Sequence, residues 1–442
     1  MNILIKTVPF IKKQIVNIKT YGLKELFRKL YILIKILIRV PIDIIAILPC
    51  MIIRILRPWF LIRVQEAPSQ NFGDFIGFIA IYYCKKKLRI DQPIKKCLDL
   101  LYIHHKDKIH NKQIAKMWKK KINFLSSYLL DPIYRINKFI PGGEVHTIKS
   151  LKFCERDINN LYKKIKILDF TKEEKIYGDE ILRKFGLKNQ DKLVMLDVRD
   201  GAYQLKKIQA RDHDWSYHKF RHTDVNKFTS AAEELATRGY FVFRMGNIVE
   251  KPFSMKNPKI IDYANSNLRS DFMDIYLGYK CSFCITTGSG FWNLPEIFNK
   301  PIIDLSVPIG DKFTHREEDL LITKHHFLKK EKRKLSLSEI FSFGLAYAND
   351  TKFFEQKGIE LIENTPEEIK EVVIEMIEKL EFKKNNKPQD EELQKAFRNL
   401  YASNLKLYNH KNSKSLANAI IHGKIKSSFG NKFLRDNKDW LK

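Results

Sequence analysis

From Leu61 onward, short apolar runs alternate with predicted helices, and this alternation is the strongest constraint on the fold. The runs at 61–65, 192–198, 240–244 and 281–286 have the length and composition of buried strands. Strands separated by helices pair in parallel, because each helix carries the chain back to the edge where the next strand begins. The pattern therefore predicts an α/β fold built on parallel sheets.

The alternation occurs in two series, which predict two Rossmann-like domains. The first series covers residues 61–170 and the second covers 171–385, in which 301–305 is expected to be the last strand. A chain of 442 residues exceeds the size of one ordinary core, so two domains are the natural expectation. Residues 386–442 are expected to form a polar tail that contains a helix, and residues 1–60 a separate N-terminal helical extension.

The N-terminal extension is both basic and strongly apolar. Residues 1–63 carry twelve Lys and Arg against two acids, one of which is Asp43, within a chain of formal charge +29. Their longest run without a basic residue, 40–53, covers roughly 21 Å as a helix, short of the roughly 30 Å bilayer core. Pro41 and Pro49 are expected to kink it. We expect membrane-associated helices in the cytoplasmic leaflet; a thin single span and an arm packed on the protein's own domains are the alternatives.

The cysteines and histidines show no spacing typical of a metal site. Six cysteines have no disulfide framework, and the single C-x-x-C pair, Cys281 and Cys284, lies inside an apolar run where two buried strand cysteines are the simpler interpretation. The two pairs of adjacent histidines, at 104–105 and 325–326, lack the further ligands that a metal site needs. We therefore expect no bound metal, and reduced thiols favour the cytoplasmic side.

The strongest local motif is the run Thr-Thr-Gly-Ser-Gly at 286–290, which follows a strand and opens a helix. Its glycines let backbone amides approach a ligand, its hydroxyls add donors, and the following helix N-terminus favours a diphosphate. A carboxylate further along that helix could accept hydrogen bonds from both ribose hydroxyls. The alternative is an ordinary Gly-rich turn with a solvated carboxylate. The candidate donor-binding residues of this motif are Thr287, Gly288, Ser289, Gly290 and Glu296.

Arginines follow two strands that are expected to be neighbours. Arg199 comes after the strand 192–198, Arg244 ends the strand 240–244, and Arg221 lies between them. The carboxyl ends of parallel strands form the edge where open α/β sheets bind ligands. Guanidinium groups suit a pyrophosphate and the charge on a departing nucleotide, so we predict donor binding by all three and a catalytic role for Arg244. The alternative is surface ion pairing with nearby aspartates, namely Asp197, Asp200 and Asp224.

A proton acceptor is expected in the first domain. Asp74 begins the helix after the first strand, where it could act as a general base or only as a helix cap. Glu144 and His146 follow a Pro-Gly-Gly turn at 141–143 and are rival candidates. From the sequence we therefore name Asp74 and His146 as candidate catalytic residues.

Several of these runs resemble a family of bacterial glycosyltransferases found among genes for surface polysaccharides. The matching segments are LDVRDGAY at 196–203, LATRGYFVFRMG at 235–246, IDYA at 261–264 and the turn at 287–290. The similarity covers roughly residues 60–310 and the C-terminal tip. The chain is also similar, more distantly, to fucosyltransferases that place arginines on a guanosine diphosphate sugar, although Arg221-His222 departs from their usual Arg-Asn pair.

The resemblance implies the two-Rossmann architecture called GT-B, with an acceptor domain at 61–170 and a sugar-nucleotide domain at 171–385. It implies a metal-independent transferase that uses a sugar nucleotide, but not which donor or acceptor. For an enzyme of this kind we expect a nucleoside-diphosphate sugar as substrate, no cofactor, and a lipid-linked or polysaccharide acceptor. With the membrane surface contacted through residues 1–63, the expected location is the cytoplasmic face of the inner membrane, as a peripheral or monotopic protein.

A second class of function is a non-catalytic, basic, membrane-associated scaffold or anion-binding protein. The charge of +29 suits an anionic partner. Nucleic acid is not expected as that partner, because the sequence has no helix-turn-helix, zinc finger or RNA-binding aromatic motif.

Overall fold

The computed structural model describes residues 22–104, 109–148, 157, 160–206, 215–305, 307–309, 316–382, 387–407 and 425–442. The chain forms two compact units. The smaller unit is drawn from residues 1–67, 93–104 and 122–149, and the larger from 68–92, 105–121 and 150–442. The units do not follow the predicted boundary at residue 170, because two segments before it, 68–92 and 105–121, pack with the larger unit.

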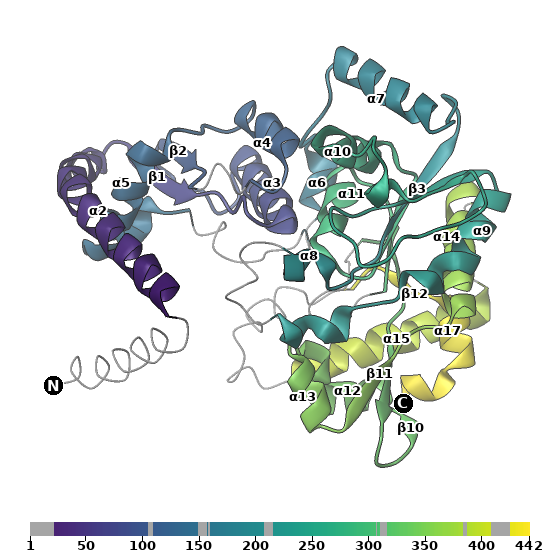
Figure 1. Ribbon diagram of the computed structural model, residues 1–442. Coiled ribbons are helices and arrows are strands. Elements are labelled where there is room, and N and C mark those ends of the chain that lie inside the picture. The colour runs from purple at the N-terminus through teal and green to yellow at the C-terminus, as the bar shows by residue number, and fades with distance from the viewer. Residues whose placement is uncertain are drawn as a thin grey trace. The chain divides into compact units, whose positions relative to one another are not determined.

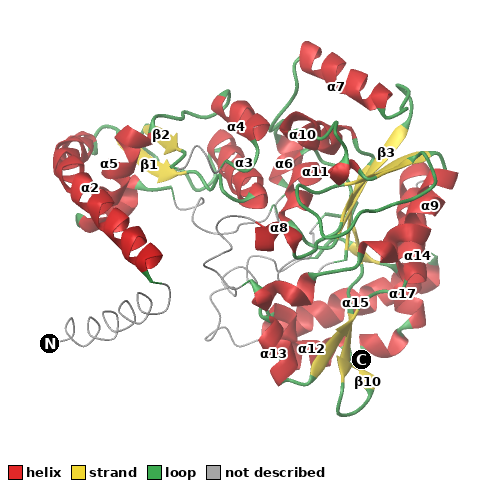
Figure 2. Cartoon of the chain, in the orientation of Figure 1, coloured by secondary structure: helices red, strands yellow, loops and turns green. Residues whose placement is uncertain are grey.

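The larger unit is built on a seven-stranded sheet in which every neighbouring pair of strands is parallel (Figures 1 and 2). The α/β fold class with a large Rossmann-like parallel sheet, expected from the sequence, is confirmed. In spatial order the strands are β12 (Ser428–Phe429), β8 (Leu320–Leu321), β7 (Ile302–Asp304), β6 (Phe283–Thr286), β3 (Lys192–Asp197), β4 (Tyr240–Arg244) and β5 (Ile260–Ile261).

The expectation that 301–305 is the last strand of the sheet is wrong. Beyond β7 the sheet gains β8 and then β12, which comes from the C-terminal end of the chain. Each of these strands has only two residues, too few to show a hydrophobic period. The C-terminal tail therefore contributes to the core of the larger unit, and Phe397, Phe429 and Trp440 are buried there.

Helices surround this sheet in the larger unit. The helix α14 (Pro366–Phe382) begins with a capping box: Glu368 N–H donates to Thr365 Oγ1 at 3.1 Å and Thr365 N–H donates to Glu368 Oε2 at 3.0 Å. The other α-helices of eight or more residues are α3 (Phe72–Leu88), α4 (Lys112–Lys119), α7 (Lys172–Lys184), α9 (Thr229–Thr237), α10 (Asp271–Lys280) and α15 (Pro388–Leu407).

The larger unit also contains shorter helical elements among its described residues. They are α6 (Leu161–Lys164), α8 (Ala202–Lys206), η5 (Ser216–Arg221), η6 (Val225–Phe228), η7 (Tyr263–Asn265), η8 (Gly290–Trp292), α11 (Asn293–Ile297), α12 (Leu337–Ser342), η9 (Leu345–Tyr347), α13 (Thr351–Gln356), α17 (Asn431–Asp436) and η11 (Lys438–Leu441). A second, antiparallel sheet has the order β10 (Arg333–Lys334), β9 (His325–Leu328), β11 (Ile359–Ile362).

The smaller unit contains two parallel strands, β1 (Leu61–Glu66) and β2 (Cys97–Tyr102), and the helices α2 (Leu23–Leu56) and α5 (Ser127–Phe139), with the short η2 (Gly143–His146). Arg63 and Asp99 face each other across the strands in a buried ion pair, with Nε–Oδ1 at 2.6 Å and Nη2–Oδ2 at 2.9 Å. The helix α2 continues through Pro41 and Pro49. Among the described residues, no helix has an apolar stretch of the length and hydropathy needed to cross a bilayer.

His326 in β9 is buried in the larger unit and packs beside Phe354, with ring centroids 6.1 Å apart. Burial lowers the pKa of His326 to about 3, whereas a histidine in an unfolded chain has a pKa near ~6.5. Between about pH 6.5 and about pH 3, the folded protein therefore keeps this ring neutral while the unfolded chain binds a proton. Because the folded pKa is depressed, stability falls as the pH decreases through that window.

Acidification from about pH 7 to about pH 4.5 is expected to destabilise the fold by roughly 2–3 kcal/mol through His326 alone, at about 1.4 kcal/mol per pH unit below the unfolded pKa. His326→Phe keeps an aromatic ring at the site and should remove this part of the pH dependence. The measurement is the free energy of unfolding in urea at several pH values. If wild type and variant lose stability in parallel between pH 6.5 and 4.5, the proposed origin is wrong.

Candidate functional site

The larger sheet has a topological switch point between β3 and β6. The chain runs from β3 to β4 and β5 on one side, then returns to the other side of β3 and continues through β6, β7 and β8. Asp197 at the end of β3 lies directly opposite Thr286 at the end of β6. In open α/β sheets the crevice outside the carboxyl ends of the strands at such a point is where ligands bind. The predicted Thr-Thr-Gly-Ser-Gly turn begins at this position.

The carboxylate of Asp197 holds the turn in place. Its Oδ2 accepts hydrogen bonds from Thr286 Oγ1 at 2.7 Å and from Ser289 Oγ at 2.6 Å. Asp197 is buried, and burial raises its pKa while the two hydroxyls act in the opposite direction. The hydroxyl of Ser289, expected to donate to a ligand, therefore donates to Asp197. From the sequence, Asp197 is expected only as an ion-pair partner, and its role in holding the turn appears only in the structure.

The backbone of the turn is fixed by further hydrogen bonds. Gly288 has φ 81°, in the left-handed region, and its N–H donates to Thr286 Oγ1 at 3.1 Å. The guanidinium of Arg221 donates to the carbonyl of Gly288. Thr287 Oγ1 accepts from the backbone N–H of Arg199 at 2.7 Å. The structure thus brings Arg199, Arg221 and the turn together. From the sequence, only Arg199 and Arg244 are expected to converge through their places at strand ends.

Arg199 differs from its neighbours in how its charge is compensated. Its guanidinium makes no hydrogen bond or ion pair with the residues that the structure describes, and its Nε is shielded from solvent. Burial lowers the pKa of Arg199, although the nearby carboxylates of Asp197 and Asp200 oppose this effect. A partly buried cation without a direct partner at a switch point is suited to receive an anion.

Arg244 is ion-paired, but it is buried rather than at the surface, and its nearer partner is Asp262, which is outside the set considered from the sequence. Its side chain is 1% exposed, with Nη1 at 3.3 Å from Asp262 Oδ1 and Nη2 at 3.7 Å from Asp200 Oδ2. It lines a pocket of about 170 Å³, whose wall also includes His222, Asp224 and Glu363. Burial, together with the Arg199 charge, lowers the pKa of His222 to about 4, so the ring is neutral near pH 7. Sequence reasoning missed this pocket because its wall comes from distant segments.

Asp74 lies in the first turn of α3, which packs against the glycine turn. A Cβ placed on Gly73 would lie 2.8 Å from Gly290 Cα, so only glycine allows the two backbones to approach this closely. The Phe72 and Phe291 rings stack beside them with centroids 4.6 Å apart. The Asn71 side chain donates to Asp74 Oδ2 at 2.9 Å, and burial raises the pKa of Asp74.

The two rival bases belong to the smaller unit. Glu144 is exposed in η2. His146 is buried, with Nδ1 at 2.8 Å from the carbonyl oxygen of Ile62. Burial lowers the pKa of His146, with the charges of Arg54 and Arg57 acting in the same direction. The ring is therefore neutral near pH 7 and engaged in holding η2 against β1.

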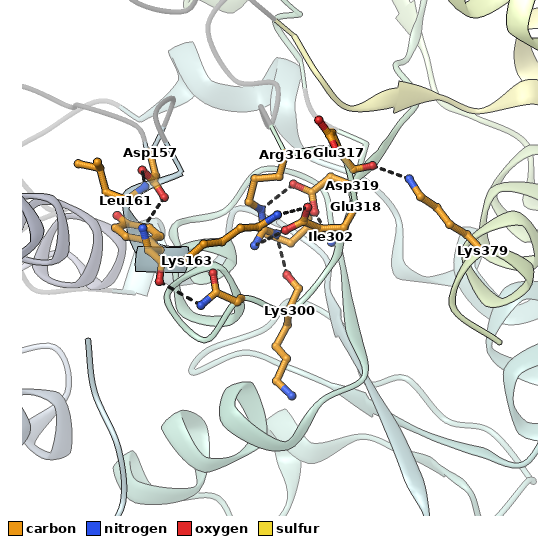
Figure 3. Close-up of polar contacts among 12 residues, drawn as sticks. Asp157, Leu161, Lys163, Lys300, Ile302, Arg316, Glu317, Glu318, Asp319 and Lys379 are labelled. Atoms are coloured by element: carbon orange, nitrogen blue, oxygen red, sulfur yellow. Dashed lines mark hydrogen bonds and ion pairs between the residues drawn. The ribbon is translucent and has the colours of Figure 1, made fainter. Parts of the chain in front are cut away.

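Glu296 does not share the surroundings of the glycine turn. It is buried in α11. Burial lowers the pKa of Arg316, but the carboxylates of Asp319 and Glu296 act in the opposite direction and the pKa is raised. Arg316 Nε and Nη2 donate to the two Asp319 oxygens at 2.9 and 2.8 Å, and Nη2 also donates to the Lys300 carbonyl at 2.6 Å (Figure 3). Ile302 N–H, at the amino end of β7, donates to Asp319 Oδ1 at 2.8 Å. This cluster lies at the amino end of β7, whereas the switch-point crevice lies at the carboxyl ends of the strands.

Comparisons with known proteins give limited information. No protein-family model matches the sequence, and no curated protein does. The chain is similar to a solved glycosyl transferase family 9 protein from Veillonella parvula, with 11% identity and a TM-score of 0.42, over 74% of this chain and 98% of that one. It is also similar to ADP-heptose LPS heptosyltransferase II of E. coli, with 12% identity and a TM-score of 0.32, over 59% and 90%. Likeness at this level gives no argument about the reaction.

Proposed function

We propose that the protein is a glycosyltransferase that moves a sugar from a nucleoside-diphosphate sugar to a growing surface polysaccharide or lipid-linked glycan. The proposal includes no metal and no cofactor, and it places the protein at the cytoplasmic face of the inner membrane. The observation that carries it is Arg199, a partly buried cation at the switch point that is tied through its backbone to Thr287. The resemblance of residues 196–203 and 235–246 to surface-polysaccharide glycosyltransferases supports it.

In this proposal the diphosphate of the donor lies beside the turn, next to Arg199 and Arg221. The acceptor hydroxyl oxygen attacks the anomeric carbon of the donor sugar, and the bond from that carbon to the diphosphate oxygen breaks. The charge that develops on the leaving diphosphate is stabilised by the guanidinium groups, because fixed cations act most strongly where charge appears. Asp74, whose pKa is raised by burial, accepts the proton of the acceptor hydroxyl.

Nucleotide binding tests the proposal directly. Thermal unfolding of the detergent-purified full chain is followed with a panel of nucleoside diphosphates and their sugars. A bound nucleotide at a hundred times its Kd stabilises by about 2.7 kcal/mol, which raises the melting temperature. Arg199→Ala should abolish the response, and Arg183→Ala, which removes an exposed arginine of α7, should leave it intact.

The outcome also decides between the two classes of function. A response to one nucleotide that disappears in Arg199→Ala supports a donor site. If every nucleotide leaves the melting temperature of the folded wild type unchanged, the transferase proposal fails and the non-catalytic scaffold becomes the better explanation.

A further inference from the structure

The outer side of α2 is an exposed apolar surface in the smaller unit. Between residues 41 and 56, every side chain classed as exposed is apolar. Ile45 is 71% exposed and Leu48 is 68% exposed. Contiguous apolar surface of this kind marks a site of contact with a protein or a membrane.

Within residues 41–56 of this helix, the two charged residues, Asp43 and Arg54, are not on the exposed side. Ala46, Cys50 and Ile53 pack against Leu130 and Ile133 of α5. Asp43, the acid that interrupts the apolar run, forms an ion pair with Arg135 of α5. Arg54 Nη1 donates to the carbonyl of Cys50 at 3.1 Å. The acid is thus compensated within the unit, and the exposed side is left without a polar residue.

Charge indicates the occupant of this surface. The exposed Arg39 and Arg57 bracket the apolar stretch, and Trp59 follows it with 73% exposure. Basic residues attract anionic headgroups, and tryptophan favours the membrane interface. A second copy of the chain would instead bring like charges together.

We propose that the smaller unit docks on an anionic lipid leaflet, with the outer side of α2 in the interface and α5 as a second contact. The helix α5 carries exposed apolar side chains of its own, Tyr128 at 86% and Leu129 at 57%. The sequence analysis placed membrane contact only in residues 1–63, so the contribution of α5 is new. The inference deepens the membrane contact of the proposed function and stands whether or not the protein transfers sugar.

Vesicle flotation of the full chain tests this inference. The wild type should float with vesicles of phosphatidylglycerol and phosphatidylcholine and bind phosphatidylcholine alone at least tenfold more weakly. Ile45→Asn with Leu48→Asn should weaken binding more than tenfold, and Tyr128→Ser with Leu129→Asn should weaken it severalfold. The matched control is Ile176→Asn with Tyr177→Ser, which changes an apolar pair of similar exposure, 59% and 52%, in the larger unit.

A second measurement does not depend on a variant that could misfold. Quenching by brominated lipid should reduce the tryptophan fluorescence of the wild type, and Trp59→Phe should remove that part of the quenching.

Failure of the wild type to float overturns the inference, and so does equal binding by the α2, α5 and control variants. A detergent-free dimer that dissociates in the α2 variant would show that a second copy covers the surface. The nucleotide response is measured separately, so the two proposals can fail independently.

Discussion

Replacement of Arg316 by methionine is expected to lower the free energy of unfolding by about 3–5 kcal/mol, because it leaves a buried carboxylate without its counter-charge. Arg316 is 1% exposed and Asp319 is 0% exposed. The guanidinium satisfies both Asp319 oxygens and the carbonyl of Lys300 (Figure 3). The measurement is urea unfolding of the variant against wild type.

A surface pair of similar geometry provides the control. Arg333 makes two hydrogen bonds to Glu339, at 2.8 and 2.6 Å, but its side chain is 44% exposed. Arg333→Met should therefore cost far less than Arg316→Met, because solvent screens an exposed ion pair. Adding Asp319→Leu to Arg316→Met should recover part of the loss, since the buried Asp319 carboxylate is then removed together with its counter-charge. Equal losses for the buried and the surface arginine would refute the explanation.

Gly290→Ala is expected to reduce turnover roughly 100-fold, the loss that follows about 1 Å of misplacement in a catalytic site. The new Cβ would lie 2.9 Å from the backbone nitrogen of Gly73, so either α3 or the glycine turn must move. Overpacking of this kind also costs about 1–3 kcal/mol of stability. The measurements are the rate of sugar transfer from the nucleotide identified by thermal shift, and the melting temperature.

A double-mutant cycle shows whether the two glycines act as one contact. Gly73→Ala should have a similar effect on stability, because its Cβ would meet Gly290 from the other side. Once one substitution has separated the backbones, the second should cost less, so the double variant should be less destabilised than the sum. Additive losses would show that the two positions are independent.

The sequence predicted those strands of the fold that have a hydrophobic pattern of their own. The strand β4 has the predicted bounds, and β1, β3 and β6 lie within two residues of theirs, because each is a buried apolar run of several residues. The strands β8 and β12 could not be predicted, because two residues carry no period and their pairing is decided by tertiary contacts. Tertiary contacts also decide that α3 packs with α11 and α4 with α10 in the larger unit, although both helices precede residue 170.

At the candidate site, the sequence predicted part of the convergence and left the hydrogen-bond partners open. Arg199 meets the turn because the carboxyl ends of the neighbouring parallel strands β3 and β6 share an edge, whereas Arg221 reaches Gly288 from the short helix η5. The partners depend on side-chain packing, which has no local signature. This is why the hydrogen bonds from Ser289 to Asp197 and from Arg244 to Asp262 appear only in the structure.

The path of the chain between the units limits how the protein can be shortened or cut. It passes from one unit to the other at 67–68, 92–93, 104–105, 121–122 and 149–150. A single protease cut near residue 150 would not yield an intact larger unit, because it would remove α3, α4 and with them Gly73. Neither unit could have been gained or lost as a simple terminal fusion. A gene fragment that encodes only residues 150–442 should therefore give a product in which the glycine turn lacks the helix that supports it.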